Sequence, residues 1–163
     1  MSVLHWVLAL VVLQRLAELA LAARNTRRLK ARGALEVGQS HYPLIVLLHA
    51  AWLLALALLV PAATPPSVPL LALFAALQAG RVWVIASLGP YWTTRIITLP
   101  DAPLVRRGPY RYLRHPNYLI VALEIAVLPL AFGAIGIAIV FSLLNGVMLW
   151  HRIRVEIQAL AGR

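Results

Sequence analysis

The chain has 163 residues, of which 62% are hydrophobic, and its mean hydropathy is +0.84. Soluble domains are about half apolar, so this composition excludes that class and indicates an integral membrane protein. The formal net charge is +10, and the chain has no cysteine, which excludes disulfides, thiolate nucleophiles and cysteine-based metal sites.

The apolar runs are long and continuous and show no period-2 alternation, which predicts membrane helices and an all-α fold. A span needs roughly 20 apolar residues, and this rule indicates about five transmembrane helices. In chain order the predicted spans are Val3 to Ala23, Pro43 to Val60, Val68 to Leu88, Tyr118 to Phe132 and Ile135 to Trp150. A proline-rich turn separates the second span from the third, and only Gly133 and Ala134 separate the last two, which predicts a tight helical hairpin.

We interpret the chain as one domain over residues 1–163, with the first span and its basic loop at 1–42 and the core at 43–163. The first span has no basic region before its apolar stretch and no small-residue cleavage site. We therefore expect it to stay as a helix and not to be removed as a signal peptide.

Basic residues follow the first, third and fifth spans, whereas the turns near Pro65 and Gly133 carry none. The positive-inside rule then places the amino terminus outside and the carboxyl terminus in the cytoplasm. Topology and attraction to anionic membrane lipids account for much of the positive charge. Nucleic-acid binding is disfavoured, because the charge lies beside membrane spans and no nucleic-acid motif accompanies it.

Four charged residues lie inside the predicted spans, where each costs roughly 2.5 to 3.5 kcal/mol at a helix centre. Arg15 and Glu18 are three residues apart and face the same way on a helix, so we expect them, with Arg81, to form interhelical ion pairs. For Glu124 two roles remain open: it either takes part in an interhelical ion pair or lines a polar cavity. His5 and His49 lack acidic or histidine neighbours at ligand spacing, so we expect packing roles and no metal site.

Two polar segments flank the last hairpin. The first is LVRRGPYRYLRHPNY, from Leu104 to Tyr118, which is cationic, aromatic and interrupted by proline. The second is LWHRIRVEIQAL, in which Arg152 and Glu156 are four residues apart. A helix continuing from the fifth span would present this cation and anion on one face at the membrane boundary. Taken alone, the pair is typical of an ordinary intrahelical salt bridge.

GPYRYLRHPNY, followed by a hydrophobic hairpin and RxxxE, resembles the isoprenylcysteine carboxyl methyltransferase family and its relatives among the membrane methyltransferases. RNTRRLKARGALEVGQSHYP and LGPYWTTRIITLPDAPLV also resemble segments of small bacterial members, so the likeness covers nearly the whole chain. It implies S-adenosylmethionine as methyl donor, a cytosolic loop and carboxyl-terminal helix that bind it within residues 43–163, and a bacterial inner membrane as location.

The resemblance also implies roles for individual residues. Arg152 and Glu156 would be catalytic, and no metal is needed. The implied cofactor contacts are Leu104, Val105, Gly108, Tyr110, His115, Tyr118, Asn145 and Glu156. Contacts to the acceptor would come from Glu124, Arg114 and Arg152. Many family members carry a second acidic residue where this chain has Ile157, which leaves one of the family's contacts without a counterpart.

The predicted reaction is methyl transfer to a carboxyl group, as in a prenylated cysteine, or to a hydroxyl group of a lipophilic acceptor. Small residues such as Ala122, Ala126 and Gly146 would let the acceptor enter between helices. One alternative is phospholipid or amine N-methylation. Another, from a different class, is a noncatalytic membrane scaffold or transport component. The sequence leaves the acceptor and the oligomeric state open.

Overall fold

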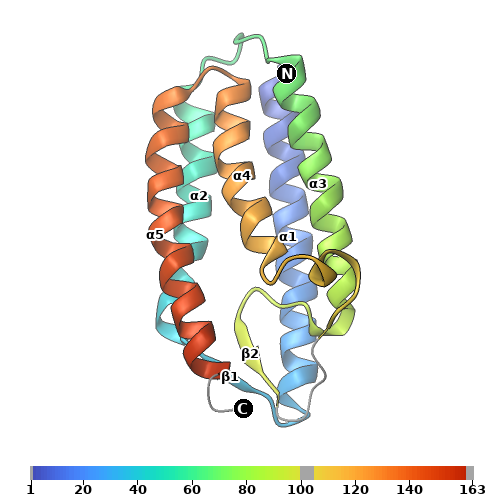
Figure 1. Cartoon of the computed structure of the whole chain (residues 1–163). Coiled ribbons are helices and arrows are strands. Elements are labelled where there is room, and N and C mark those ends of the chain that lie inside the picture. Colours follow the sequence, from blue (N-terminus) through green and yellow to red (C-terminus); the bar gives the residue numbers. More distant parts are fainter. Residues whose placement is uncertain (1, 100–104, 161–163) are drawn as a thin grey trace.

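The computed structural model describes residues 2–99 and 105–160, which form a bundle of α-helices with one small sheet at its end (Figure 1). The helices are α1 (Val3–Lys30), α2 (Tyr42–Leu59), α3 (Val68–Leu88), α4 (Pro116–Ala131) and α5 (Ile135–Leu160). Four of them are long and apolar enough to cross a membrane, and α4 is a shorter apolar helix of 16 residues. The prediction of an all-α integral membrane protein is confirmed.

The helices agree with the predicted spans except at their ends. α1 continues from Ala23 to Lys30, because its last turns pack against the protein and bury Asn25, Thr26 and Leu29. α4 begins at Pro116, since a proline at the first position of a helix needs no hydrogen-bond donor. The outward faces of the helices are largely apolar, as lipid contact requires.

The connections divide the bundle into two ends (Figure 1). The amino terminus, the proline-rich turn between α2 and α3, and the turn between α4 and α5 lie at one end. That last turn spans Phe132 to Ala134, with Gly133 in a left-handed conformation at φ 68°, so the predicted hairpin is confirmed. The sheet and the end of α5 lie at the opposite end, which therefore gathers the basic segments. The division at residue 42 stays a prediction.

A two-stranded sheet, which the sequence did not indicate, joins the segments after α1 and α3. Strands β1 (Leu35–Val37) and β2 (Ile96–Thr98) pair antiparallel, with Glu36 opposite Ile97. The Glu36 carboxylate pairs with Lys30 at the end of α1 and with Arg95 beside β2. Burial opposes its ionisation, but hydrogen bonds from the two cations hold its pKa below the ordinary value. The sheet thus fixes the polar end of the bundle.

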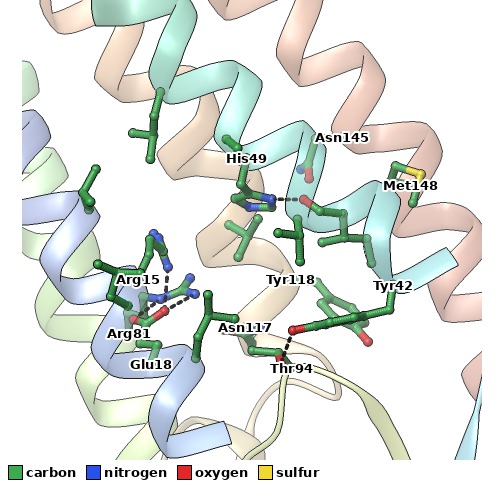
Figure 2. Close-up of a pocket in the computed structure, with 18 of the residues that line it drawn as sticks. Arg15, Glu18, Tyr42, His49, Arg81, Thr94, Asn117, Tyr118, Asn145 and Met148 are labelled. Atoms are coloured by element: carbon green, nitrogen blue, oxygen red, sulfur yellow. Dashed lines mark hydrogen bonds and ion pairs between the residues drawn. The ribbon is translucent and has the colours of Figure 1, made fainter. Parts of the chain in front are cut away.

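A buried cluster of four charges links three helices, and Figure 2 shows three of its members, Arg15, Glu18 and Arg81. Arg81 of α3 donates two hydrogen bonds to Glu18 of α1, at 2.6 and 2.8 Å, and one of 3.2 Å to Glu124 of α4. Arg15 bonds Glu18 at 2.9 Å and Glu124 at 2.6 Å. Gln78 donates to the second oxygen of Glu124. The expected ion pairing of Arg15, Glu18 and Arg81 is therefore present, and Glu124 completes it.

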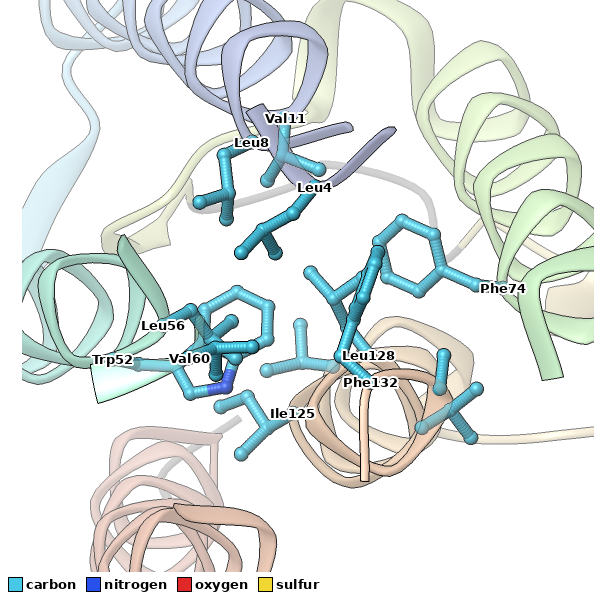
Figure 3. Close-up of a cluster of buried hydrophobic side chains, with 13 residues drawn as sticks. Leu4, Leu8, Val11, Trp52, Leu56, Val60, Phe74, Ile125, Leu128 and Phe132 are labelled. Carbon is cyan, nitrogen blue, oxygen red and sulfur yellow. The ribbon is translucent and has the colours of Figure 1, made fainter. Parts of the chain in front are cut away.

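The hydrophobic core lies in the half of the bundle nearest the amino terminus. Figure 3 shows its side chains meeting between the helices. The core combines the start of α1 and α3 with the end of α2 and α4, and its largest members include Trp52, Phe74 and Phe132. Trp52 and Leu128 are almost completely buried. The cluster of four charges lies just beyond this core, and the remaining half of the bundle has room for a polar site.

We expect Arg81→Met to destabilise the protein by about 3 kcal/mol, because it leaves two buried carboxylates with only Arg15 as a cation. The matched control is Arg28→Met, which removes an exposed arginine near the end of α1. Thermal unfolding of both variants in the same detergent measures the difference. Equal stability of the two variants would contradict a structural role for the cluster.

Candidate functional site

The two polar segments singled out in the sequence meet at the Tyr118 hydroxyl. This hydroxyl donates a hydrogen bond of 2.7 Å to Glu156 Oε2 and accepts one of 2.9 Å from Arg152 Nε. Among the described residues no direct ion pair joins Arg152 to Glu156, so the expected intrahelical salt bridge is replaced by a link through the tyrosine. We call Tyr118, Arg152 and Glu156 the tyrosine-bridged triad.

The start of α4 positions Tyr118, the aromatic member of this triad. His115 is the residue before the helix, and Pro116 occupies its first turn. One turn later the Tyr118 ring stacks on the His115 ring, with centroids 5.2 Å apart and planes 10° from parallel. His115 Nδ1 lies 3.8 Å from Glu156 Oε2, and the Glu156 side chain is 27% exposed. A carboxylate and an aromatic pair are therefore accessible together.

Arg152 is held from a second side. Its Nη2 donates a 2.6 Å hydrogen bond to the Thr94 carbonyl, and the Thr94 hydroxyl is 3.0 Å from the Tyr42 hydroxyl. The segment before Thr94 is tied to α1, because the Asn25 amide donates to the carbonyls of Gly89 and Trp92. This arrangement explains why α1 extends beyond its apolar run: its last turns hold the loop that positions Arg152.

The turn before α4 packs directly on α3. Gly108 has φ 57°, and a Cβ atom at this position would lie 2.1 Å from Ser87 Oγ and 3.2 Å from Trp83 Nε1. Arg107 Nε donates a 2.7 Å hydrogen bond to the Ser87 carbonyl. The close approach that Gly108 permits is thus to helix α3, and it holds the middle of the Leu104 to Tyr118 segment against that helix.

The remaining predicted residues are distributed around this cluster. Tyr110 is partly buried, and burial together with the nearby Glu156 carboxylate raises its pKa to about 12. Val105 is half-buried, Arg114 is exposed, and Leu104 falls outside the described residues. Asn145 is 3% exposed and projects from α5 into the cavity described next (Figure 2).

A cavity of about 530 Å³ lies between the tyrosine-bridged triad and the cluster of four charges (Figure 2). Its size falls in the range of about 300 to 1,000 Å³ that is typical of ligand sites. Its walls are mainly apolar. Polar groups on the wall include Arg15, His49, Arg81, Asn117, Tyr118 and Arg152.

The cavity borders the lipid between α1 and α2. Val12 and Leu16 of α1 and Val46 and Leu54 of α2 line it, yet each is 39% exposed or more on the outer surface of the bundle. The entrance expected beside Ala122, Ala126 and Gly146 does not coincide with this cavity, because none of the three lines it, and that entrance stays a prediction. Helices α4 and α5 pack against each other on that side.

Several cavity residues were not assigned a site role from the sequence. Thr94 acts through its backbone carbonyl, which a side-chain pattern does not reveal. His49 was expected only to pack, although a histidine in an otherwise apolar span is itself a signal. Asn117 belongs to the RHPNY motif, and its Oδ1 is buried without a hydrogen-bond partner in the described structure. Glu124 bonds within the cluster of four charges and is absent from the cavity wall; its predicted contact with an acceptor stays untested.

A second cavity, of about 580 Å³, lies beside Arg106, Tyr110 and Arg111. It is more polar than the first and belongs to the segment before α4. Within residues 2–99 and 105–160, no group of three or more histidine, aspartate or glutamate side chains has the geometry to hold a metal ion.

The chain is similar to one known protein family and to two bacterial proteins. The model of the Isoprenylcysteine carboxyl methyltransferase (ICMT) family matches residues 70–162, which contain the triad and the hairpin. The uncharacterized protein YpbQ of Bacillus subtilis is 40% identical over 162 residues, covering 96% of each chain. An uncharacterized protein of Haemophilus influenzae is 27% identical over 119 residues, which are 69% of this chain and 67% of its own. No solved structure matches significantly.

We expect Gly108→Ala to destabilise the protein more than Gly33→Ala. Both glycines have positive φ, 57° and 88°, so both substitutions strain the backbone, but only at Gly108 does the new Cβ meet Ser87 Oγ. Because that contact holds the turn against α3, we also expect the tryptophan fluorescence of Trp83 to change in Gly108→Ala alone. Thermal unfolding and emission spectra of the two variants test this, and identical behaviour would show that the close contact is unimportant.

Proposed function

Because the chain belongs to the isoprenylcysteine carboxyl methyltransferase family, whose members are membrane methyltransferases, we propose that it transfers a methyl group from S-adenosylmethionine to a lipophilic acceptor. The main observation in support of this proposal is that a polar cluster and an apolar cavity lie next to each other. The tyrosine-bridged triad offers charges and aromatic faces, and it opens directly onto an apolar cavity that borders the lipid.

The residues present suit the chemical groups of S-adenosylmethionine. The cofactor carries an ammonium, a carboxylate, a sulfonium and an adenine. Glu156 is a partly exposed carboxylate for the ammonium, and Arg106 and Arg111 beside the second cavity are cations for the carboxylate. The stacked His115 and Tyr118 rings offer aromatic surface to the adenine or the sulfonium. Val105, Gly108 and Tyr110 would shape the loop around the cofactor, and Asn145 would contact it from α5.

When bound, this cofactor supplies a methyl carbon that is already activated by its positive sulfur. The protein therefore has to align the acceptor and keep water away, which are the tasks of a positioned, apolar cavity. Two of the Arg152 nitrogens are held by Tyr118 and Thr94. Its Nη1 has no hydrogen-bond partner among the described residues, and we propose that it orients the acceptor oxygen from the cavity wall.

The cavity favours an acceptor with a long apolar body and a neutral or anionic oxygen group. Apolar side chains of α1 and α2 form the lipid-side wall. On the polar wall Arg15 and Arg81 are paired with Glu18 and Glu124, whereas Arg152 is a cation that no carboxylate contacts directly among the described residues. Such a wall suits a carboxylate or a hydroxyl better than the cationic head of an amine. Prenylated cysteines and other lipophilic acids or alcohols are therefore the proposed class, ahead of phospholipid N-methylation.

We propose that the end of the bundle with the sheet and the triad faces the cytoplasm, in a bacterial inner membrane. The basic segments gather there, and the positive-inside rule assigns such segments to the cytoplasm. This orientation places the amino terminus outside. It also places the proposed cofactor site where S-adenosylmethionine is made, since the cofactor is a cytoplasmic metabolite.

We expect S-adenosylhomocysteine, the demethylated cofactor, to bind the purified protein. Glu156→Gln should weaken binding about tenfold to a hundredfold, the equivalent of losing one charge-assisted hydrogen bond. The matched control, Gln158→Ala, changes an exposed side chain of α5 near Glu156 and should leave both the affinity and the stability unchanged. Isothermal titration calorimetry of all three proteins measures this. Absence of binding by the parent protein would refute the methyltransferase proposal and favour a noncatalytic role.

The acceptor class is tested by radiolabelled S-adenosylmethionine with prenylcysteines, fatty acids, alkylated phenols and phosphatidylethanolamine. We expect label on the lipophilic oxygen acceptors and none on phosphatidylethanolamine. Methanol released by alkali identifies a carboxyl ester, whereas alkali-stable label on a phenol identifies an ether. Methylation of the phosphatidylethanolamine amine would overturn the proposed acceptor class but keep the methyltransferase.

A further inference from the structure

His49 presents a basic nitrogen to the cavity. Its Nδ1 lies 2.8 Å from the carbonyl oxygen of Ile45, one turn earlier on α2. A carbonyl oxygen only accepts hydrogen bonds, so Nδ1 carries a proton and the neutral ring has its lone pair on Nε2. His49 lines the cavity, and Figure 2 shows its ring between the Arg15 and Arg81 side chains and Asn145. Within the described residues Nε2 has no hydrogen-bond partner.

The other wall groups that could accept a proton already take part in hydrogen bonds. Glu18 accepts hydrogen bonds from Gln14, Arg15 and Arg81, and the Tyr118 hydroxyl is held by Arg152 and Glu156. The Tyr42 hydroxyl contacts Thr94. Glu124 lies behind the wall, bonded to both arginines and to Gln78. Among the described wall residues, His49 is therefore the one whose basic nitrogen has no hydrogen-bond partner and faces the cavity.

We propose that His49 is the proton acceptor of the reaction and that the acceptor is a lipophilic molecule with an ionisable hydroxyl group, such as a phenol or an enol. This inference rests on the proposed methyltransferase function and narrows its substrate class. A carboxylate is already ionised near neutral pH and needs no base, so a base inside the cavity is useful only where the acceptor arrives with its proton. Proton transfer by a positioned histidine contributes about 10² to 10⁴ in rate.

The step balances in atoms and electrons. The acceptor oxygen forms a bond to the methyl carbon, the carbon–sulfur bond breaks with its electron pair passing to sulfur, and the hydroxyl proton passes to His49 Nε2. The products are a methyl ether, a neutral thioether and an imidazolium. The imidazolium keeps its hydrogen bond to the Ile45 carbonyl, and it returns its proton to solvent after the products leave.

The first test compares methyl transfer to alkylated phenols that carry the same chain but differ in hydroxyl acidity. We expect His49→Gln, which keeps a polar side chain but accepts no proton, to lower kcat at least a hundredfold for weakly acidic phenols. The loss should shrink steadily as the phenol becomes acidic enough to ionise by itself. The control His5→Gln changes an exposed histidine at the start of α1 and should behave as the parent.

A second test has a readout that does not depend on methyl transfer. We expect a nitrophenol with the same alkyl chain, added with S-adenosylhomocysteine at a pH below the phenol's own pKa, to show the absorption band of its ionised form when bound to the parent protein. The band should be absent or much weaker with His49→Gln, because no base then receives the proton. Calorimetry of the same variant should give an unchanged affinity for S-adenosylhomocysteine.

Three results would overturn the assignment of His49. One is equal kcat of parent and His49→Gln proteins on weakly acidic phenols. Another is a loss that does not depend on phenol acidity, which would indicate a packing role. The third is methylation of a prenylcysteine carboxylate but of no phenol. In each case, retained binding of S-adenosylhomocysteine by the parent protein would show that the proposed methyltransferase function survives.

Discussion

The structure depends on the neutralisation of four charges inside the bundle. Arg15, Glu18, Arg81 and Glu124 come from three helices, and each would cost roughly 2.5 to 3.5 kcal/mol if inserted alone at the centre of a membrane helix. Together they carry two positive and two negative charges, so their mutual hydrogen bonds offset the cost of burial. Because lipid gives helices little hydrophobic reason to associate, this network fixes how α1, α3 and α4 meet. It also marks the boundary between the apolar core and the cavity.

The two halves of the bundle on either side of that boundary have different roles. The core around Trp52 and Leu128 packs the half of the bundle nearest the amino terminus, and the opposite half holds the cavity and the tyrosine-bridged triad. The sheet and Asn25 stabilise this second half from outside the membrane, by holding the loop whose Thr94 carbonyl positions Arg152. A long apolar ligand can therefore lie between α1 and α2 while its reactive group faces polar side chains.

Hydropathy was sufficient to predict the helices, their hairpin and the gathering of basic segments at one end, because apolar length is a local property of the chain. It could not predict that α1 continues to Lys30, since that extension depends on burial of Asn25 against a loop 64 residues away. The sheet was missed for the same reason: a strand of three residues can be recognised only from its pairing with another strand. In the candidate site, the meeting of RHPNY with Arg152 and Glu156 followed from family resemblance. The roles of the Thr94 carbonyl and of His49 Nε2 depend on the three-dimensional arrangement of residues far apart in the chain, so the sequence alone did not reveal them.

The central claim is that the tyrosine-bridged triad and the adjoining cavity together form one site for donor and acceptor. The most direct measurement is an experimental structure of the protein in a lipid nanodisc with S-adenosylhomocysteine. We expect the ligand's ammonium to contact Glu156, its aromatic neighbours to be His115 and Tyr118, and its sulfur to face the cavity that Arg152 and His49 line. Density for the ligand away from Glu156, or with its sulfur directed away from this cavity, would contradict the claim.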